Sequence, residues 1–179
     1  MKTIRLSTYL LLLIALAACN STKSLQEYYV DNSENPNFLS VDLPVSLLNM
    51  DKADLNQDEQ LALESLRKLN VLAFKKTDTN SAAFLTEKSN VKAILKSNKF
   101  TELMKMNTSY GKATIKYIGD DDAIDEVIIY GDNDEKGFLL VRVLGDDMNP
   151  AKMMQFLQTL EKSNYNGEGL EKIGELFKG

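Results

Sequence analysis

The side chains in this sequence that could support chemistry are clusters of carboxylates and a single cysteine, because the chain of 179 residues contains no histidine. The first cluster is Asp54-Leu55-Asn56-Gln57-Asp58, whose spacing matches the first three ligands of a calcium-binding EF-hand loop. Glu59, however, stands where that loop needs glycine, and Ser65 stands where it needs a bidentate glutamate. The other interpretation is a helix N-terminus, with Asn56 as the N-cap and Glu59 three residues later. We favour the helix N-terminus.

A denser acidic cluster comprises Asp120, Asp121 and Asp122, followed by Asp125 and Glu126. Adjacent carboxylates can hold Ca²⁺ or Mg²⁺ through their oxygens, so the three consecutive aspartates are the candidate metal ligands. The same pattern is typical of a turn between two strands, where exposure to water screens the repulsion between like charges. We favour the turn and expect no tightly held metal. The acidic run at residues 132–135 presents the same choice.

Composition excludes several classes of function. Without histidine the chain cannot use a Ser-His-Asp triad, a Cys-His pair, a histidine base or a histidine metal site. The net charge of −5 argues against binding to nucleic acid and against electrostatic binding to anionic lipid. Gly167-Glu168-Gly169 lacks the third glycine and the preceding strand of a dinucleotide site. We therefore expect no catalytic residue, no cofactor and no nucleic-acid partner.

The lone cysteine, Cys19, ends an apolar stretch near the N-terminus. A short positive start precedes residues 9–18, which are uncharged and mostly aliphatic but too few to span a membrane. This order predicts a secretory signal peptide over residues 1–18. Leu16-Ala17-Ala18-Cys19 resembles the lipobox of bacterial lipoproteins, which implies cleavage before Cys19 and acylation of this residue. The alternative is an ordinary signal peptide that contains a chance cysteine.

The resemblance to lipoproteins implies a location as well as a modification. Acyl chains on Cys19 would make it a membrane anchor without a redox or metal role. Residues 20–24 lack the acidic run that exports such lipoproteins to the cell surface. Asn20 is also not the aspartate that favours retention in the inner membrane. The resemblance therefore implies the outer membrane, on its periplasmic side.

Length and composition predict a single domain behind this anchor. Residues 19–37 are rich in polar side chains and are interpreted as the lipidated cysteine followed by a flexible tether. In the alternative, Tyr28-Tyr29-Val30 docks onto the domain. Residues 38–162 form the domain, and residues 163–179 form a C-terminal tail with a short amphipathic helix.

Hydrophobic spacing predicts the order strand, helix, strand, helix, four strands, helix. The predicted elements are a strand at 38–43, a helix that starts after Asn56 and ends at Asn70, a strand at 71–75, a helix at 82–97, strands at 100–106, 112–118, 123–130 and 137–144, and a helix that begins after Asn149-Pro150. Leu66 and Leu69 are assigned to the first long helix because they follow Ala62 at helical spacing. The fold class is α+β, a mainly antiparallel sheet made of a meander of four strands plus one or two N-terminal strands, with helices packed on one face.

This layout, together with the lipobox, resembles the bacterial family known as domain of unknown function 4252. The resemblance is carried by residues 38–43, 66–72 and 100–103, and above all by residues 124–129 (IDEVII) and 138–146 (FLLVRVLGD). The family implies a small envelope lipoprotein of the Gram-negative Bacteroidota type. It implies no known activity.

Two functions remain open after these exclusions. The first is a lipid-anchored, non-enzymatic module that binds or regulates a protein partner in the cell envelope. The alternative is a carboxylate-based binder of a small ligand or divalent cation, or a hydrolase that uses such carboxylates. The lack of histidine and of a glycine-rich loop favours the first.

Overall fold

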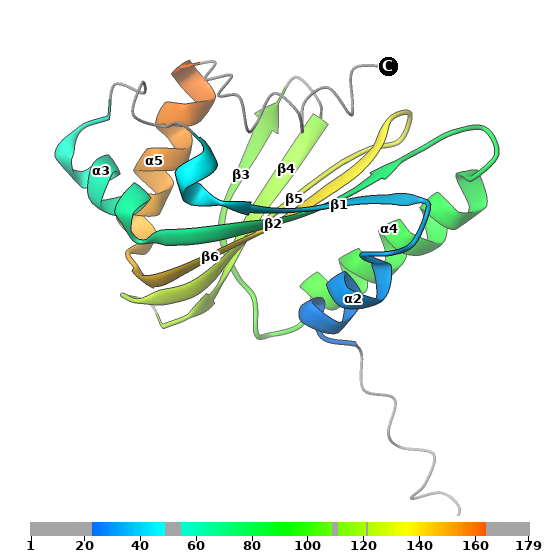
Figure 1. Cartoon of the computed structure of the whole chain (residues 1–179), viewed down its shortest axis with the longest axis horizontal. Coiled ribbons are helices and arrows are strands. Elements are labelled where there is room, and N and C mark those ends of the chain that lie inside the picture. The colour runs from blue at the N-terminus through cyan, green and yellow to red at the C-terminus, as the bar shows by residue number, and fades with distance from the viewer. Residues whose placement is uncertain (1–22, 49–54, 109–110, 121, 164–179) are drawn as a thin grey trace, which may run out of the picture.

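A six-stranded antiparallel sheet forms the centre of the computed structural model, with the strand order β1-β2-β6-β5-β4-β3 (Figure 1). The strands are β1 Phe38–Pro44, β2 Leu66–Lys75, β3 Thr101–Thr108, β4 Gly111–Gly119, β5 Ile124–Asn133 and β6 Gly137–Met148. The structure describes residues 23–48, 55–108, 111–120 and 122–163. Cys19, Asp54, Asp121 and the predicted helix of the C-terminal tail lie outside these residues.

Two pairs of helices cover the sheet, one pair on each face (Figure 1). Helices α3 (Gln57–Glu64) and α5 (Pro150–Ser163) pack together on one face. Helices α2 (Leu25–Asn32) and α4 (Ser81–Leu95) lie on the other, and a short 3-10 helix, η1 (Val45–Leu48), follows β1. The α+β fold class with an antiparallel sheet is therefore confirmed. The helices, however, lie on both faces and not on one as predicted.

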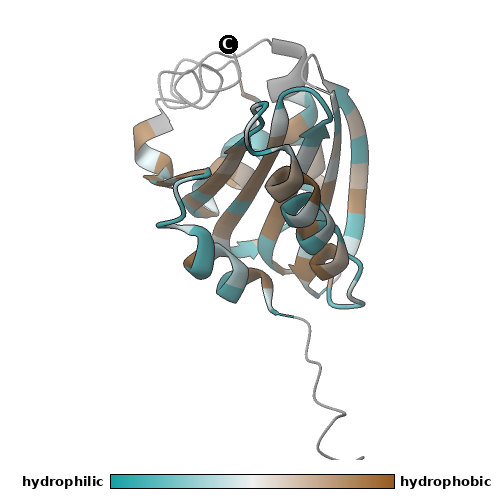
Figure 2. Cartoon of the chain, turned by 90° about the vertical axis from the view of Figure 1, so that its right-hand side faces the viewer, coloured by the Kyte–Doolittle hydropathy of each residue, from teal (hydrophilic) through white to brown (hydrophobic). Residues whose placement is uncertain are grey.

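Both faces need cover because the central strands β2, β5 and β6 are apolar on each side. Leu72, Ile128 and Leu140 point toward α2 and α4, whereas Val71 and Val127 point toward α3 and α5. All five side chains are fully buried. Figure 2 shows these hydrophobic bands of the sheet behind the helices. A sheet with only one covered face would leave the other set in water, at roughly 1.5–3 kcal/mol for each large side chain.

Helix α2 forms within the segment that the sequence analysis assigned to the tether. Ser24 caps it through a capping box, in which the Ser24 hydroxyl accepts a hydrogen bond from the backbone N–H of Glu27 at 3.2 Å. The Glu27 carboxylate accepts the return bond from the Ser24 N–H at 2.7 Å. The two bonds satisfy N–H groups that the start of a helix otherwise leaves without partners.

The two tyrosines of α2 dock this helix onto the domain, which is the alternative that the sequence analysis gave to a flexible tether. Tyr28 and Tyr29 are only 3% and 7% exposed. The Tyr28 hydroxyl donates to the Glu87 carboxylate of α4 at 2.7 Å. The Tyr29 hydroxyl donates to the Asp42 carboxylate of β1 at 2.8 Å and accepts from the Ser40 hydroxyl at 3.0 Å. Helix α2 is therefore bound to both the sheet and α4.

Strand β2 begins earlier than the sequence analysis predicts. Helix α3 ends at Glu64, so the predicted continuation of this helix to Asn70 is wrong. A β-bulge lies between Leu66 and Lys68, opposite β6. The extra residue turns Leu66 and Leu69 toward the same core, which reproduces in a strand the three-residue spacing expected of a helix.

The remaining predicted elements of the described chain are confirmed, with shifts of a few residues at their ends. Asn56 and Glu59 form the predicted capping box of α3. Asn149 caps α5 by accepting a hydrogen bond from the Lys152 N–H at 3.1 Å. Among the described residues, no helix combines the length and apolarity needed to cross a membrane.

Gly137 and Gly131 offer a matched test of the sheet geometry. Gly137 starts β6 with φ of 127°, and an added Cβ would collide with the carbonyl oxygen of Phe74. We expect Gly137→Ala to lower the free energy of unfolding by at least about 2 kcal/mol in urea denaturation. At Gly131 the nearest atoms to an added Cβ lie at 3.8 Å, so Gly131→Ala should cost little. Equal losses in the two variants would contradict this register.

Candidate functional site

The carboxylates of the EF-hand-like segment form helix caps and ion pairs within the fold. In the EF-hand-like segment, Asn56 and Glu59 cap α3, and Asp58 pairs with Lys152 of α5 at 3.1 Å. The Glu59 carboxylate also accepts a hydrogen bond from the Thr159 hydroxyl at 2.6 Å, which is the main reason that its pKa is lowered. This segment is therefore a helix start that joins α3 to α5.

The acidic cluster at Asp120 and Asp122 lies in the turn between β4 and β5. The backbone N–H of Asp120 donates to the Ala123 carbonyl at 3.0 Å, and the Ala123 N–H donates back at 3.3 Å. Both aspartate side chains are exposed. In the described part of the chain, no three acidic, histidine or cysteine side chains come together as a group that could hold a metal.

The second acidic turn, between β5 and β6, is bound by lysines of α4. Lys88 pairs with Asp132 and, at 2.6 Å, with Asp134. Lys92 pairs with Asp132 at 3.1 Å. The hydrogen bond and positive charge of Lys88 hold the pKa of Asp134 below its usual value. This turn therefore fixes α4 on the sheet.

Glu126 belongs to a buried ion pair and not to the acidic turn beside it. Its carboxylate accepts two hydrogen bonds from the Arg142 guanidinium, at 2.5 Å and 3.0 Å. Both residues are less than a tenth exposed, and they lie on neighbouring strands, β5 and β6. A buried pair of this geometry holds two strands in one register, because either charge alone would be costly to bury.

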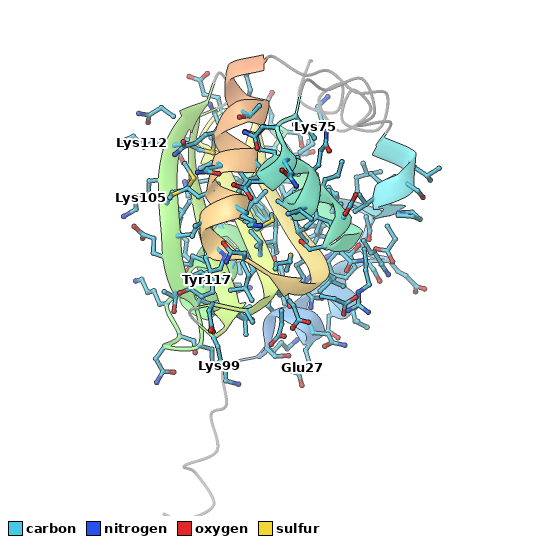
Figure 3. All side chains as sticks on the ribbon, turned by 90° about the vertical axis from the view of Figure 1, so that its left-hand side faces the viewer. Glu27, Lys75, Lys99, Lys105, Lys112 and Tyr117 are labelled. Carbon is cyan, nitrogen blue, oxygen red and sulfur yellow. The ribbon has the colours of Figure 1, made fainter. Side chains whose placement is uncertain are left out.

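A lysine-lined groove lies between α4 and strands β3 and β4, and has a volume of about 590 Å³. Five lysines and two carboxylates line it, so the groove carries a local excess of positive charge. The lysines are Lys92, Lys96, Lys105, Lys112 and Lys116. The apolar part of its wall includes Leu95 and Tyr130. We call this feature the lysine groove; Figure 3 shows Lys105 and Lys112 along the strands that form one wall.

Strand register explains why these lysines share a face. In β4, Ile115 and Tyr117 point into the core beneath α5, so the alternating Lys112 and Lys116 point to the α4 side. The β3 residues opposite them bring Lys105 to the same side. Lys92 of α4 and Lys96, the C-cap residue of this helix, complete the opposite wall.

Some of the groove charges have a structural partner and others do not. The Lys116 ammonium donates a hydrogen bond to the carbonyl of Leu95 at 2.9 Å. Leu95 is the last residue of α4, and a positive charge at the C-terminal end of a helix is stabilising. Lys92 pairs with Asp132, and Lys105 pairs with Glu102 at 3.1 Å. Lys96 and Lys112 form no ion pair or hydrogen bond with any described residue. These two exposed ammonium groups are available to a ligand.

Tyr130 is the buried polar residue of the groove wall. Its side chain is 5% exposed, and its hydroxyl has no hydrogen-bond partner among the described residues. Burial raises the pKa of Tyr130 well above its usual value, so the hydroxyl stays neutral. The Lys92 ammonium lies 5.9 Å from the ring centroid, within reach of a cation–π interaction. A buried hydroxyl without a partner is uncommon in a folded protein.

The sequence analysis missed the lysine groove because its lysines are dispersed over three elements. No run of positive charge marks them, and the net charge of the chain is negative. The available signals were the spacing of four between Lys92 and Lys96 at the end of a helix and between Lys112 and Lys116 on a strand. Neither spacing reveals that the two pairs face each other.

The sequence profile of one family, described as domain of unknown function (DUF4252), matches residues 28–156. The chain belongs to this family. The family assignment made from the sequence is confirmed, and the matched residues begin at Tyr28 in α2 and end at Phe156 in α5. No curated protein and no solved structure matches the chain.

Two tyrosines provide a test of the buried hydroxyl. We expect Tyr130→Phe to leave the free energy of unfolding unchanged or to raise it by about 1 kcal/mol, because it removes a buried group without a partner. Tyr28→Phe removes the hydrogen bond to Glu87 and should lower it by about 1–2 kcal/mol. Urea denaturation of both variants measures the contrast. A marked loss of stability in Tyr130→Phe would show that its hydroxyl has a partner in solution.

Proposed function

We propose that the protein is a lipid-anchored, non-enzymatic binding module of the cell envelope, whose lysine groove receives an anionic group of its partner. Acyl chains on Cys19 hold it at the outer membrane, on the periplasmic side. The partner is an envelope component and not nucleic acid. The observation that carries the binding role is the groove itself, where Lys96 and Lys112 are exposed without a partner among the described residues.

The chemistry of the groove supports binding more than catalysis. Its ammonium groups can donate hydrogen bonds to a carboxylate or phosphate, and the neutral Tyr130 hydroxyl lies in the same wall. Both carboxylates of the groove, Glu102 and Asp132, are already paired with lysines. With these two engaged and no histidine in the chain, the groove offers no evident general base.

The order of the N-terminal residues supports the anchor. A positive start, a short apolar stretch and small residues before Cys19 follow one another as in a lipoprotein signal. Helix α2, the first helix among the described residues, begins at Leu25, six residues after Cys19. A domain that starts so soon after the cysteine leaves no room for a second membrane-associated segment between them.

The lipid anchor is tested at Cys19. We expect the purified native protein to begin at Cys19 and to carry the added mass of its acyl chains in intact-mass spectrometry. Cys19→Ser should remove this mass and leave an unprocessed or soluble form, because no acyl chain can then form. A native protein with an unmodified cysteine would rule out the anchor.

The binding role is tested with tripolyphosphate as a simple anionic probe. We expect the double variant Lys105→Gln/Lys112→Gln to raise the Kd of the probe about tenfold in isothermal titration calorimetry, since two charges of the groove are lost. Binding should also weaken with salt. Lys75→Gln is the matched control, because Lys75 is exposed and does not line the groove. An equal loss in the control would show diffuse attraction and not a site.

A further inference from the structure

Strand β3 is an outer strand of the sheet and forms part of the lysine groove. It pairs with β4 on one side, and on its other side the sheet has no further described strand. In a paired strand, alternate residues turn their backbone N–H and C=O groups away from the neighbouring strand. Apart from the pairing with β4, the backbone of residues 101–107 forms no hydrogen bond with any described residue. An open edge of this kind is a template for one more strand.

The two sides of this edge differ in chemistry. Lys105 of β3 and Lys112 of β4 line the lysine groove, so the side that faces α4 is polar and positively charged. Met104 and Met106 are partly buried against the core beneath α5, so the opposite side is apolar. A strand added to β3 would place its alternate side chains on these two sides. The complementary sequence therefore alternates acidic and apolar residues.

The lysines of the groove are within reach of such a strand. Lys105 lies on β3 itself, so an acidic side chain beside it can form a direct cross-strand ion pair. Lys112 lies one strand further in, at about 10 Å from the added strand, a distance that a lysine and a glutamate side chain span together. Lys105 already pairs with Glu102 at 3.1 Å, but both side chains are exposed. Exposed pairs contribute little stability, so Lys105 can exchange its partner at small cost.

The lysine groove faces away from the point at which the lipid anchor joins the domain. In Figure 3, Lys105 and Lys112 lie toward the end of the molecule that holds Lys75, whereas Glu27 and Lys99 lie at the other end. Glu27 is in the first turn of α2, the helix that follows the anchor in the chain. A partner in the groove therefore approaches from the side away from the anchoring membrane, which favours a protein segment over a lipid headgroup.

We propose that an extended acidic–apolar segment of an envelope protein binds at β3 by adding a strand to the six-stranded sheet. This inference rests on the proposed function, because the carboxylates of the segment supply the anionic group that the lysine groove receives. Backbone hydrogen bonds give affinity, and the lysines select an acidic sequence. A lysine on an edge strand also opposes pairing with strands that lack the complementary charge. The β-bulge between Glu102 and Met104 limits regular pairing to residues 104–108.

The test uses the native lipidated protein in a non-ionic detergent and a fluorescent octapeptide of alternating glutamate and valine. We expect saturable binding in fluorescence anisotropy and slower hydrogen–deuterium exchange of the β3 amides in the complex. Lys105→Gln/Lys112→Gln should raise the Kd of the octapeptide about tenfold. Lys75→Gln should leave it unchanged, because Lys75 is exposed and lies outside the groove. An equal loss in Lys75→Gln would show diffuse attraction and would overturn the inference.

Two methylated octapeptides separate strand pairing from attraction by charge alone. One carries N-methyl groups on its glutamates and the other on its valines, so both keep the charge of the parent peptide. In an extended strand these two sets of amides lie on opposite edges, and only one edge meets β3. We expect one methylated peptide to bind like the parent and the other to lose binding. Equal affinity of the two, whether kept or lost, would overturn the added strand.

Tripolyphosphate separates the failure of this inference from the failure of the proposed function. Binding of tripolyphosphate without binding of the octapeptide would overturn the added strand and retain an anion-binding groove. Binding of neither would overturn both. Exchange of the β3 amides that slows with protein concentration, in the absence of peptide, would assign the edge to a second copy of the chain. Glu102 of one copy would then pair with Lys105 of the other, and the inference would be overturned.

Discussion

The whole structure depends on the fact that strands β2, β5 and β6 are apolar on both faces. Leu72 and Val71 are neighbours in sequence, point to opposite sides, and are both fully buried. Neither side can face water without losing roughly 1.5–3 kcal/mol for each large side chain. The chain therefore supplies two separate helical layers, α2 with α4 and α3 with α5. Even the short α2 is needed, because Tyr28 and Tyr29 complete the cover of one layer.

The same constraint leaves the lysine groove. The apolar core beneath α4 is centred on β2, β5 and β6, and the β4 side chains on that face become polar at Lys112, Thr114 and Lys116. Beyond the edge of α4 the sheet therefore stays open, and lysines from helix and strand face each other across the gap. The buried pair of Glu126 and Arg142 and the paired lysines Lys88 and Lys92 hold α4 and the strands in the positions that define the groove.

Much of this fold could be predicted from the sequence, because its signals are local. Alternating runs with short polar turns predict the meander, and the spacing of Asn56 and Glu59 predicts the start of α3. Leu66 and Leu69 were wrongly assigned to a helix because the β-bulge gives them the spacing of helical residues, and the local sequence contains no signal for this bulge. Helix α2 was assigned to the tether, with docking of its tyrosines as the alternative. Leu25, Tyr28 and Tyr29 stand in a polar stretch, and their burial depends on the surface of the sheet and α4, which the local sequence does not reveal. The groove could not be predicted, since its lysines meet only through strand register and helix packing.

Net charge was the least informative of the sequence properties for binding. The chain carries −5 overall, yet many of its carboxylates lie in turns and caps, where Asp58, Asp132 and Asp134 are paired with lysines. Because screening limits electrostatic attraction to about a Debye length, a ligand responds to the charges within that distance and not to the total. The lysine groove therefore carries a local excess of positive charge although the chain as a whole is acidic. Overall acidity and a locally basic groove are therefore compatible features of one molecule.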